Sequence, residues 1–390
     1  MPNQTSRSPG TSPLFSRRKW VGAVASAGLV PLASQALPQA EGAASLTLLG
    51  AAWRGPGAQD PYFAGVLAAD WQRQTLTIRY AVPLPTRAHG LLPEAGGGLL
   101  VNGVRPGGWL LRCDGAGQVV QRVDVSAESA HVRLSGHVVA ADEAIYTTEI
   151  DYRNDQGRIG VRDRHTLRKL DEWASGGIEP HQLLPDPQGH LMVANGGVRR
   201  TLEDRKFDVH RMDSSLVRLD GRSGRPLGHW KLDDPRLSLR HQAWSGASSP
   251  DGPRLGVAMQ AEHDDPAQRA AAPILAVLEG DRLHTPAGAS GGRGYAGDIS
   301  PAYDAGFALS SNQAALAQLW HPALPEQLTP FVQLKEAYAL AGWPGVVDGR
   351  GGGVLVATAI GLVRWHPRAE PVFLRWPQPM ALDNHWVLMS

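Results

Sequence analysis

Five segments of the chain repeat one pattern: a histidine begins a short apolar run, a turn follows, and a second apolar run ends in a polar residue. His89, His137, His181 and His241 are spaced by 48, 44 and 60 residues, and His385 stands in the terminal segment DNHWVLMS. Such spacings fit repeats of four-stranded blades, which take about 40–45 residues each, with insertions in some loops. The pattern predicts an all-β protein, a β-propeller, in which a histidine returns to the same place blade after blade.

The repeats predict seven blades closed into a ring. The seventh blade is shared between the chain ends, because residues 45–82 supply three strands and the tail from Asp383 supplies the missing first strand. Joining the two ends removes the exposed edges of an open sheet. The chain's 45 Gly and 30 Pro are spread along it, as short strands joined by tight turns require. The six complete blades are expected at 86–126, 134–174, 178–233, 238–286, 294–334 and 340–378.

The first 36 residues have the features of a targeting segment. Arg17 and Arg18 precede the apolar stretch VGAVASAGLVPLA, and the small residues Ser34 and Ala36 suit signal peptidase. We expect a twin-arginine signal peptide over residues 1–36, a periplasmic protein that is exported folded, and one propeller domain over residues 37–390. The alternative is a membrane anchor, but the interrupted stretch is shorter than the ~20 residues of a span. No membrane span is expected after cleavage.

Charge and cysteine content narrow the range of partners. Removing residues 1–36 takes away four basic residues and no acidic one, which leaves 34 basic against 37 acidic residues. A chain this close to neutral lacks the basic surface that nucleic acids attract, so we expect no nucleic-acid partner. Cys113 is the single cysteine, so no internal disulfide can form and folding depends on strand pairing and packing.

Strand direction places the polar residues at one end of the ring. In an antiparallel sheet the start of the first strand and the end of the second lie at the same edge. Because first strands surround the channel, the five histidines should meet around one mouth, with Asp298 and Trp343 at the corresponding places of the fifth and sixth blades. The ends of second strands supply candidate cofactor-binding residues on that face, namely Arg54, Asn102, Glu149, Asn195 and Gln260, together with Asn312 and Thr358.

A ring of imidazoles suits a transition metal. Neutral imidazole nitrogen binds copper, iron, zinc or nickel, and Glu149 or Asp298 could complete a site or orient a ligand through its second nitrogen. The sequence therefore suggests a metal or metal-chelate site. The alternative is that these side chains bind water and backbone carbonyls where seven strands converge. The proposed metal ligands are His89, His137, His181, His241 and His385.

Three long loops, 150–158, 196–215 and 261–272, are expected on the same face, and loops this long are often functional. The basic residues of 196–215 could clamp an anion. We expect them instead to pair with acidic residues of the same loop, namely Glu203, Asp204 and Asp208. In the third loop we expect the acidic pair Asp264 and Asp265 to be exposed and unpaired.

Several segments together resemble an exported bacterial propeller family known as domain of unknown function 1513. They are IYTTEIDYRNDQGRIGVRD, IEPHQLLPDPQGHLMVANGG, RMDSSLVRLD, SLRH and the closing DNHW. The resemblance covers essentially the whole mature chain and implies a periplasmic seven-bladed propeller. Members commonly accompany imelysin-like iron-uptake proteins, which implies a role in handling iron. Family members often read GPH where this chain reads Glu179-Pro180-His181, and END where it reads Glu149-Ile150-Asp151, so Glu179 adds a carboxylate beside the ring.

Two classes of function fit these features. In the first, which we favour, the protein is a binding module that holds iron or copper, a metal chelate or a partner protein at the channel mouth, with residues 196–215 as a lid. In the second it is a metal-dependent hydrolase or oxidoreductase, with Glu149 or Glu179 as the base and a metal-bound water as the nucleophile. Histidines outnumber acidic residues in the ring, which favours a transition metal over calcium.

Overall fold

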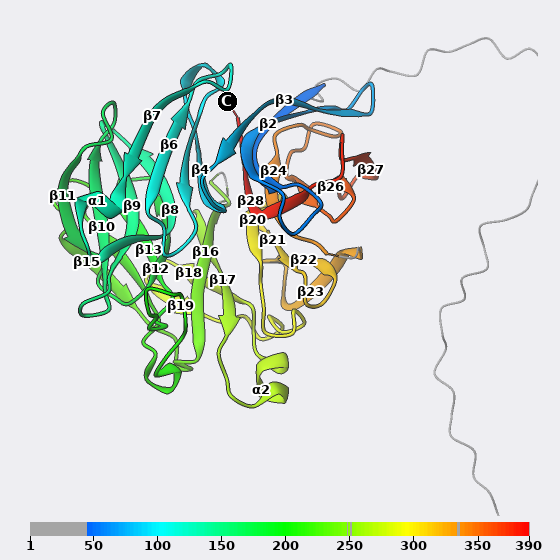
Figure 1. Cartoon of the computed structure of the whole chain (residues 1–390). Helices are drawn as coiled ribbons and strands as arrows, with labels where there is room; N and C mark the ends of the chain where they lie inside the picture. The colour runs from blue at the N-terminus through cyan, green and yellow to red at the C-terminus, as the bar shows by residue number, and fades with distance from the viewer. Residues whose placement is uncertain (1–44, 248, 250–251, 334–335, 390) are drawn as a thin grey trace, which may run out of the picture. The chain divides into compact units, whose positions relative to one another are not determined.

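The computed structural model describes residues 45–247, 249, 252–333 and 336–389. The expected export signal, residues 1–36, lies outside these residues. The described chain is mostly β, with seven sheets of four antiparallel strands each. The sheets are the blades of a seven-bladed β-propeller, as the repeats predicted (Figure 1).

Six blades are consecutive in the chain, and each begins with its innermost strand. Their observed limits agree with the six predicted blades to within a few residues. The strands, blade by blade, are β4 (Ala88–Pro93), β5 (Leu99–Gly103), β6 (Trp109–Cys113) and β7 (Val119–Asp124); β8 (Val132–Ala141), β9 (Ala144–Asp151), β10 (Gln156–Asp163) and β11 (Lys169–Ala174); β12 (Pro180–Pro185), β13 (Leu191–Asn195), β14 (Ser215–Leu219) and β15 (Pro226–Trp230); β16 (Leu237–Ser245), β17 (Arg254–Ala261), β18 (Leu275–Glu279) and β19 (Arg282–His284); β20 (Asp298–Pro301), β21 (Phe307–Ser311), β22 (Leu316–His321) and β23 (Leu324–Gln333); and β24 (Leu340–Trp343), β25 (Gly353–Ala357), β26 (Gly361–His366) and β27 (Ala369–Arg375).

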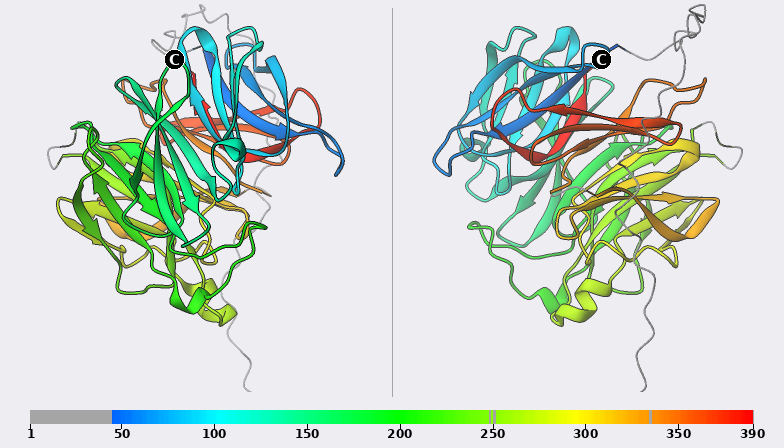
Figure 2. Two further views of the ribbon diagram at one scale, coloured as in Figure 1. Left: turned by 60° about the vertical axis from the view of Figure 1, so that its left-hand side comes forward. Right: turned by 90° about the vertical axis from the view of Figure 1, so that its right-hand side faces the viewer.

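The seventh blade joins the two ends of the described chain. Its innermost strand is β28 (Ala381–Leu388), followed outward by β1 (Leu46–Arg54), β2 (Tyr62–Asp70) and β3 (Thr75–Leu84). The pairing of β28 with β1 is antiparallel and runs from Leu388 opposite Leu49 to Ala381 opposite Arg54. Figure 2 shows the red C-terminal strand beside the blue N-terminal strands. The predicted closure of the ring by its two ends is confirmed.

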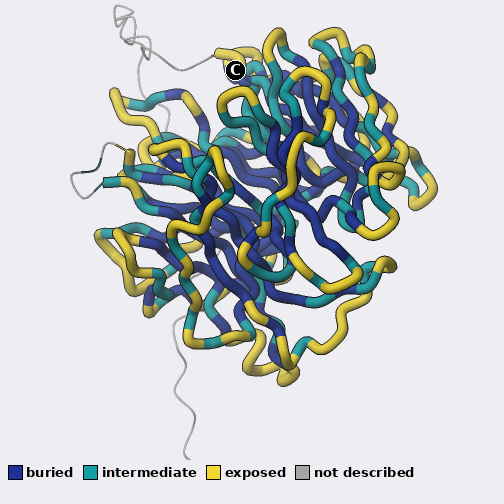
Figure 3. Tube along the Cα trace, turned by 90° about the vertical axis from the view of Figure 1, so that its left-hand side faces the viewer, coloured by how far each residue is buried: buried dark blue, intermediate teal, exposed yellow. Residues whose placement is uncertain are grey.

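The core lies between neighbouring blades. Leu49 of the closing blade packs in one cluster with Trp343 and Leu355 of the sixth blade, and all three are almost fully buried. Outermost strands such as β7 alternate half-buried and exposed residues, because they have a sheet neighbour on one side only. Figure 3 shows this gradient as buried inner strands and exposed outer turns.

Within the residues that the structure describes, regular helix is limited to short segments between strands. The helix α1 (Val125–Glu128) precedes β8, and α2 (Pro266–Ala271) lies between β17 and β18. In the part of the chain that the structure describes, no helix has the length and apolar character needed to cross a membrane.

Candidate metal centre

Five buried histidines meet at the innermost strands of the propeller. They come from five different blades, on β4, β8, β12, β16 and β28. Among the pairs in contact, ring centroids are separated by 4.2 Å for His241 and His385 and up to 6.2 Å for His89 and His241. Each of the five residues is only 2–8% exposed. The structure therefore brings together His89, His137, His181, His241 and His385. We expected them around the mouth of the channel, and they are instead buried among the innermost strands.

A β-bulge accompanies each of these histidines. A bulge bends its strand and re-aims the side chain at that point. β20 and β24, which carry no ring histidine, pair with their neighbours without any shift of register. In the five strands that carry one, the register shifts across the histidine: between Ala88 and Leu91, Leu134 and Val138, Pro180 and Gln182, Leu239 and Gln242, and Leu382 and Trp386.

Glycines beside two histidines let the inner strands approach closely. A Cβ atom on Gly136 would lie 2.1 Å from the carbonyl oxygen of His181. A Cβ atom on Gly90 would lie 2.0 Å from Oδ1 of Asn102 and 3.0 Å from Cα of His137. No side chain fits at these distances, so the two glycines permit the close packing of neighbouring innermost strands around the histidines.

One pair of ring nitrogens is separated by a distance that fits either a hydrogen bond or two ligands of one metal ion. Nε2 of His181 lies 3.3 Å from Nε2 of His241. Two nitrogens bound at about 2.0–2.1 Å to one tetrahedral ion would be separated by about 3.3 Å. Two sets of three ligand atoms lie within 4.8 Å of one another, one set from His89, His137 and His181 and the other from His137, His241 and His385.

Most of these nitrogens lack a protein partner. Within the described residues, both nitrogens of His89 are buried without a hydrogen bond, as are Nε2 of His137 and His385 and Nδ1 of His181 and His241. Burial lowers the pKa of His89, His137, His181 and His241 well below the usual value, and a neighbouring ring histidine lowers each pKa further. These four imidazoles are therefore neutral at pH 7 and offer lone pairs.

The fifth blade contributes a carboxylate in place of a histidine. Asp298 is the first residue of β20, and its Oδ1 lies 3.3 Å from Nδ1 of His385. In the sixth blade, Trp343 is buried against Arg364 and His366. The predicted interruption of the polar ring at this blade agrees with these contacts.

A buried layer of charge lies next to the histidines. Glu179, two residues before His181, is fully buried. Its Oε1 lies 3.0 Å from Arg105, 2.8 Å from Arg200 and 2.8 Å from Arg240. Burial alone would raise the pKa of Glu179, but the charges of the three arginines outweigh it and lower the pKa to about 2. Glu179 is thus an anion whose carboxylate is already bound by three arginines of the protein.

The 196–215 loop covers this layer. The amide nitrogen of Val198 donates to Oε2 of Glu179, and Arg200 binds the same carboxylate. Farther along the loop, Asp204 lies 2.8 Å from Arg105 of the first blade. The loop is therefore fastened to the buried carboxylate of Glu179 and to the first blade.

The loop, which belongs to the third blade, also contacts the fourth blade. Lys206 lies 2.6 Å from Glu262, which precedes α2, and the loop and α2 project from the same end of the molecule (Figure 1). The expected pairs inside the loop are present, because Arg205 lies 3.5 Å from Glu203, Arg200 lies 3.1 Å from Asp204 and Arg211 lies 4.0 Å from Asp208. The expectation was incomplete, since Arg200, Asp204 and Lys206 also bind residues outside the loop.

Glu149 does not join the histidines. Its Oε1 lies 3.1 Å from Arg162 and its Oε2 lies 2.7 Å from Lys169, on the next two strands of the same blade, β10 and β11. Thr147 also donates to Oε1. The fully buried guanidinium of Arg162 requires a counter-charge. Glu128, at 2.8 Å, and Glu149 supply it together, and Glu149 turns outward from the axis to do so.

The other predicted second-strand residues make contacts with the fold itself. Asn102 and Asn195 are fully buried and hydrogen-bonded, whereas Arg54 lies at a rim pocket of about 190 Å³ together with Tyr62 and Arg87. The partners that the structure gives these residues are Gly136 O for Asn102 (2.8 Å), Ser175 Oγ for Asn195 (2.8 Å), Ala296 O for Gln260 (3.5 Å), Gly361 O for Thr358 (2.8 Å) and Ala58 O for Arg54 (3.4 Å).

The acidic pair in the 261–272 loop is exposed, as expected, but it is paired, contrary to expectation. Asp264 lies 3.0 Å from Arg236. The side chain of Asp265 caps α2 by accepting hydrogen bonds from the amides of Ala267 and Gln268. Both carboxylates therefore hold the loop in place.

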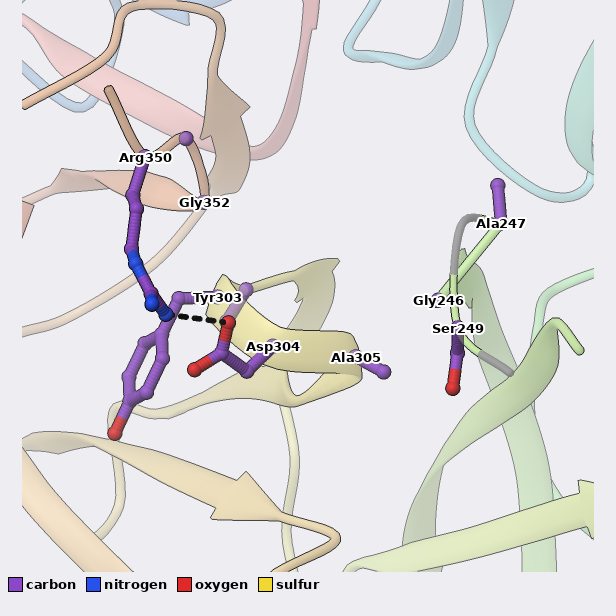
Figure 4. A pocket seen from close by; sticks show the side chains of 10 residues that line it. Gly246, Ala247, Ser249, Tyr303, Asp304, Ala305, Arg350 and Gly352 are labelled. Carbon is purple, nitrogen blue, oxygen red and sulfur yellow. Dashed lines mark ion pairs between the residues drawn. The ribbon is translucent and has the colours of Figure 1, made fainter. Parts of the chain in front are cut away.

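A larger pocket, of about 670 Å³, lies at the other ends of the innermost strands. Its lining comes from the turns that follow β16, β20 and β24, and it includes Gly246, Tyr303 and Arg350. Figure 4 shows Arg350 facing Asp304, and this pair is separated by 3.8 Å. The pocket contains none of the histidines.

Sequence reasoning considered Arg200 as part of the basic 196–215 loop but missed Arg105 and Arg240 of the charged layer. Arg240 directly precedes His241, so the pair RH in the segment SLRH was a signal that could have revealed it. Arg105 comes from the connection between β5 and β6 of another blade, and no local pattern marks its contact with Glu179.

Solved structures with similar folds share little sequence with this chain. A candidate 6-phosphogluconolactonase from Bacteroides fragilis has a TM-score of 0.57 and 11% identity, over 89% of this chain and 99% of the other. A second candidate 6-phosphogluconolactonase, from Bacteroides uniformis, has a TM-score of 0.52 and 11% identity, over 87% and 99%. Virginiamycin B lyase from Staphylococcus aureus has a TM-score of 0.51 and 11% identity, over 75% and 85%. These likenesses show the fold alone.

The comparison with curated proteins finds no match. The model of a family of unknown function, DUF1513, matches residues 82–389. The matched region contains all five ring histidines, Asp298 and the 196–215 loop. The chain therefore belongs to the DUF1513 family.

Proposed function

We propose that the protein is a binding module for a transition-metal ion, held by the five histidines of the inner strands. The observation that carries the proposal is the set of six buried imidazole nitrogens without partners in the described chain. A buried polar atom left unsatisfied costs about 1–3 kcal/mol. One bound ion satisfies several of these nitrogens together. Ordered water is the alternative that the sequence left open, and metal titration distinguishes the two.

The donor set favours copper among the metals considered. All five candidate ligands are imidazoles, and divalent affinity at nitrogen sites rises from iron to copper. Iron remains the metal implied by the family resemblance, and ferrous iron accepts imidazole ligands. A free ion fits better than a chelate, because ring centroids only 4.2–6.2 Å apart leave no room for a chelator between them.

Binding is better supported than catalysis. An enzyme of the class considered above needs a free base beside the metal. Glu149 is bound by Arg162 and Lys169, and Glu179 is bound by three arginines that lower its pKa to about 2. Both carboxylates are therefore engaged by basic side chains and neither is a free base beside the histidines. The 196–215 loop then acts as a lid over the bound ion.

The cellular setting is also part of the proposal. Paired arginines before an apolar stretch, at Arg17 and Arg18, support export of the folded protein to the periplasm. The absence of any cysteine except Cys113 fits a fold that does not depend on disulfides. Imelysin-like iron-uptake proteins are the partners that the family resemblance suggests.

Metal titration of the purified protein, freed of residues 1–36, tests the function. Copper(II) and iron(II) are added separately, excess metal is removed, and the bound metal is measured by mass spectrometry. We expect near one equivalent of metal in the wild-type chain. We expect none in the double variant His137→Ala/His181→Ala, because each of the two ligand sets loses at least one member.

Two exposed histidines provide the matched control. His131 and His165 lie on the surface of the same blade as His137, and the variant His131→Ala/His165→Ala should keep its metal. Equal metal content in the two double variants, or no binding by the wild-type chain, would reject the proposal.

A further inference from the structure

We propose that Asp298 is a positioning residue that fixes the tautomer of His385 and so makes its Nε2 a metal ligand. This inference rests on the proposed function, because it assigns a role within the same histidine cluster. It adds a residue from a blade that carries no ring histidine.

The geometry of Asp298 is fixed by the backbone of two blades. Its Oδ1 accepts a hydrogen bond from its neighbour's amide, Ile299 N, at 2.9 Å, and its Oδ2 accepts one from Leu340 N, the first residue of β24, at 2.8 Å. The residue is 6% exposed. The carboxylate therefore cannot rotate freely, and it presents Oδ1 at 3.3 Å from Nδ1 of His385.

A carboxylate accepts hydrogen bonds and does not donate them. In the form of His385 that carries a single proton, this 3.3 Å contact favours that proton on Nδ1. The other nitrogen, Nε2, then carries the lone pair, and it is buried without a protein partner. His385 belongs to the ligand set that also contains His137 and His241.

An orienting role explains Asp298 better than direct metal binding. Both of its oxygens already accept hydrogen bonds from backbone amides, and its Oδ1 lies 3.3 Å from Nδ1 of His385. A carboxylate that holds the second nitrogen of a histidine ligand raises the basicity of the ligand, and its loss typically weakens metal affinity about 10–100-fold. Asp298 acts from the fifth blade on a histidine of the seventh.

The test compares Asp298→Asn with Asp383→Asn. Asp383 is a matched control, since it is a buried aspartate two residues from His385 that binds Arg87 instead of a histidine. Copper(II) affinity is measured by competition with a chelator of known strength. We expect Asp298→Asn to keep near one equivalent with affinity lowered about 10–100-fold, and we expect Asp383→Asn to keep the wild-type affinity.

A second readout needs no metal. Nitrogen-15 chemical shifts of the histidine side chains report which ring nitrogen carries the proton. In the wild-type chain and in Asp383→Asn we expect His385 to be protonated at Nδ1, and in Asp298→Asn we expect this preference to be lost. His385 protonated at Nε2 in the wild-type chain, or equal losses of affinity in the two variants, would overturn the inference. A wild-type chain that binds no metal but shows the expected tautomers would reject the proposed function and leave the positioning role of Asp298 standing.

Discussion

Glu179 has a left-handed backbone conformation, which residues other than glycine rarely adopt. Its φ is +56°, which costs a residue with a Cβ roughly 1 kcal/mol or more. Glycine at this position would avoid this cost. The compensation in this chain is electrostatic, because Arg105, Arg200 and Arg240 all bind the Glu179 carboxylate.

Replacing Glu179 by Gln should lower the free energy of unfolding by about 3–5 kcal/mol at pH 7, the usual cost of removing one partner from a buried ion pair. The folded state lowers the pKa of Glu179 from 4.5 to about 2. Its stabilisation is therefore complete above pH 4.5 and is lost as the pH falls toward 2. Urea denaturation at pH 7 and pH 3 should show the difference between variant and wild type shrinking in acid.

Glu203→Gln is the control for this measurement. Glu203 is exposed and forms an ion pair with Arg205 at 3.5 Å, so its replacement should change stability by less than about 1 kcal/mol. A Glu179 variant as stable as the Glu203 variant would contradict the electrostatic account.

At the scale of elements, the sequence did not predict the β-bulges that lie at the five ring histidines. Histidine spacing placed each residue on a first strand, and that placement is confirmed for His89, His137, His181, His241 and His385. A register shift depends on pairing between strands, which no single segment encodes. The glycines next to His89 and His137 were the local signal, since they mark a close approach of backbones.

Gly136→Ala should destabilise the fold by about 1–3 kcal/mol, the usual cost of overpacking, because the new methyl group would lie 2.1 Å from the carbonyl oxygen of His181. Gly351→Ala is the control, as a Cβ atom there meets nothing within 4 Å. Thermal unfolding of the two variants should show a clearly lower Tm for Gly136→Ala alone. Equal Tm values would show that the inner strands do not need this close approach.

At the scale of the whole molecule, the number of blades and their closure followed from repetition in the sequence. Turn signals and apolar runs repeat with each blade, so errors in single strands do not change the count. The side-chain networks did not follow in the same way. Glu149 turned outward to Arg162, and Arg105 reached Glu179 from another blade, because such contacts depend on the three-dimensional packing of blades.

The pairing of β28 with β1, which closes the ring, leads to a further prediction. Deleting residues 381–390 removes β28 and exposes an edge of β1, which invites association of chains. We expect the shortened protein to lose cooperative thermal unfolding and to aggregate. The variant His385→Ala keeps the strand and should unfold cooperatively. A shortened chain with the cooperativity of the wild type would contradict the role of the shared blade.

The most direct test of the metal centre is X-ray absorption of the copper-loaded protein. The account predicts three or four nitrogen ligands at about 2.0–2.1 Å with the multiple scattering of imidazole, and loss of this signal in His137→Ala/His181→Ala. A spectrum dominated by oxygen ligands, or one unchanged in the double variant, would place the metal elsewhere and contradict the account.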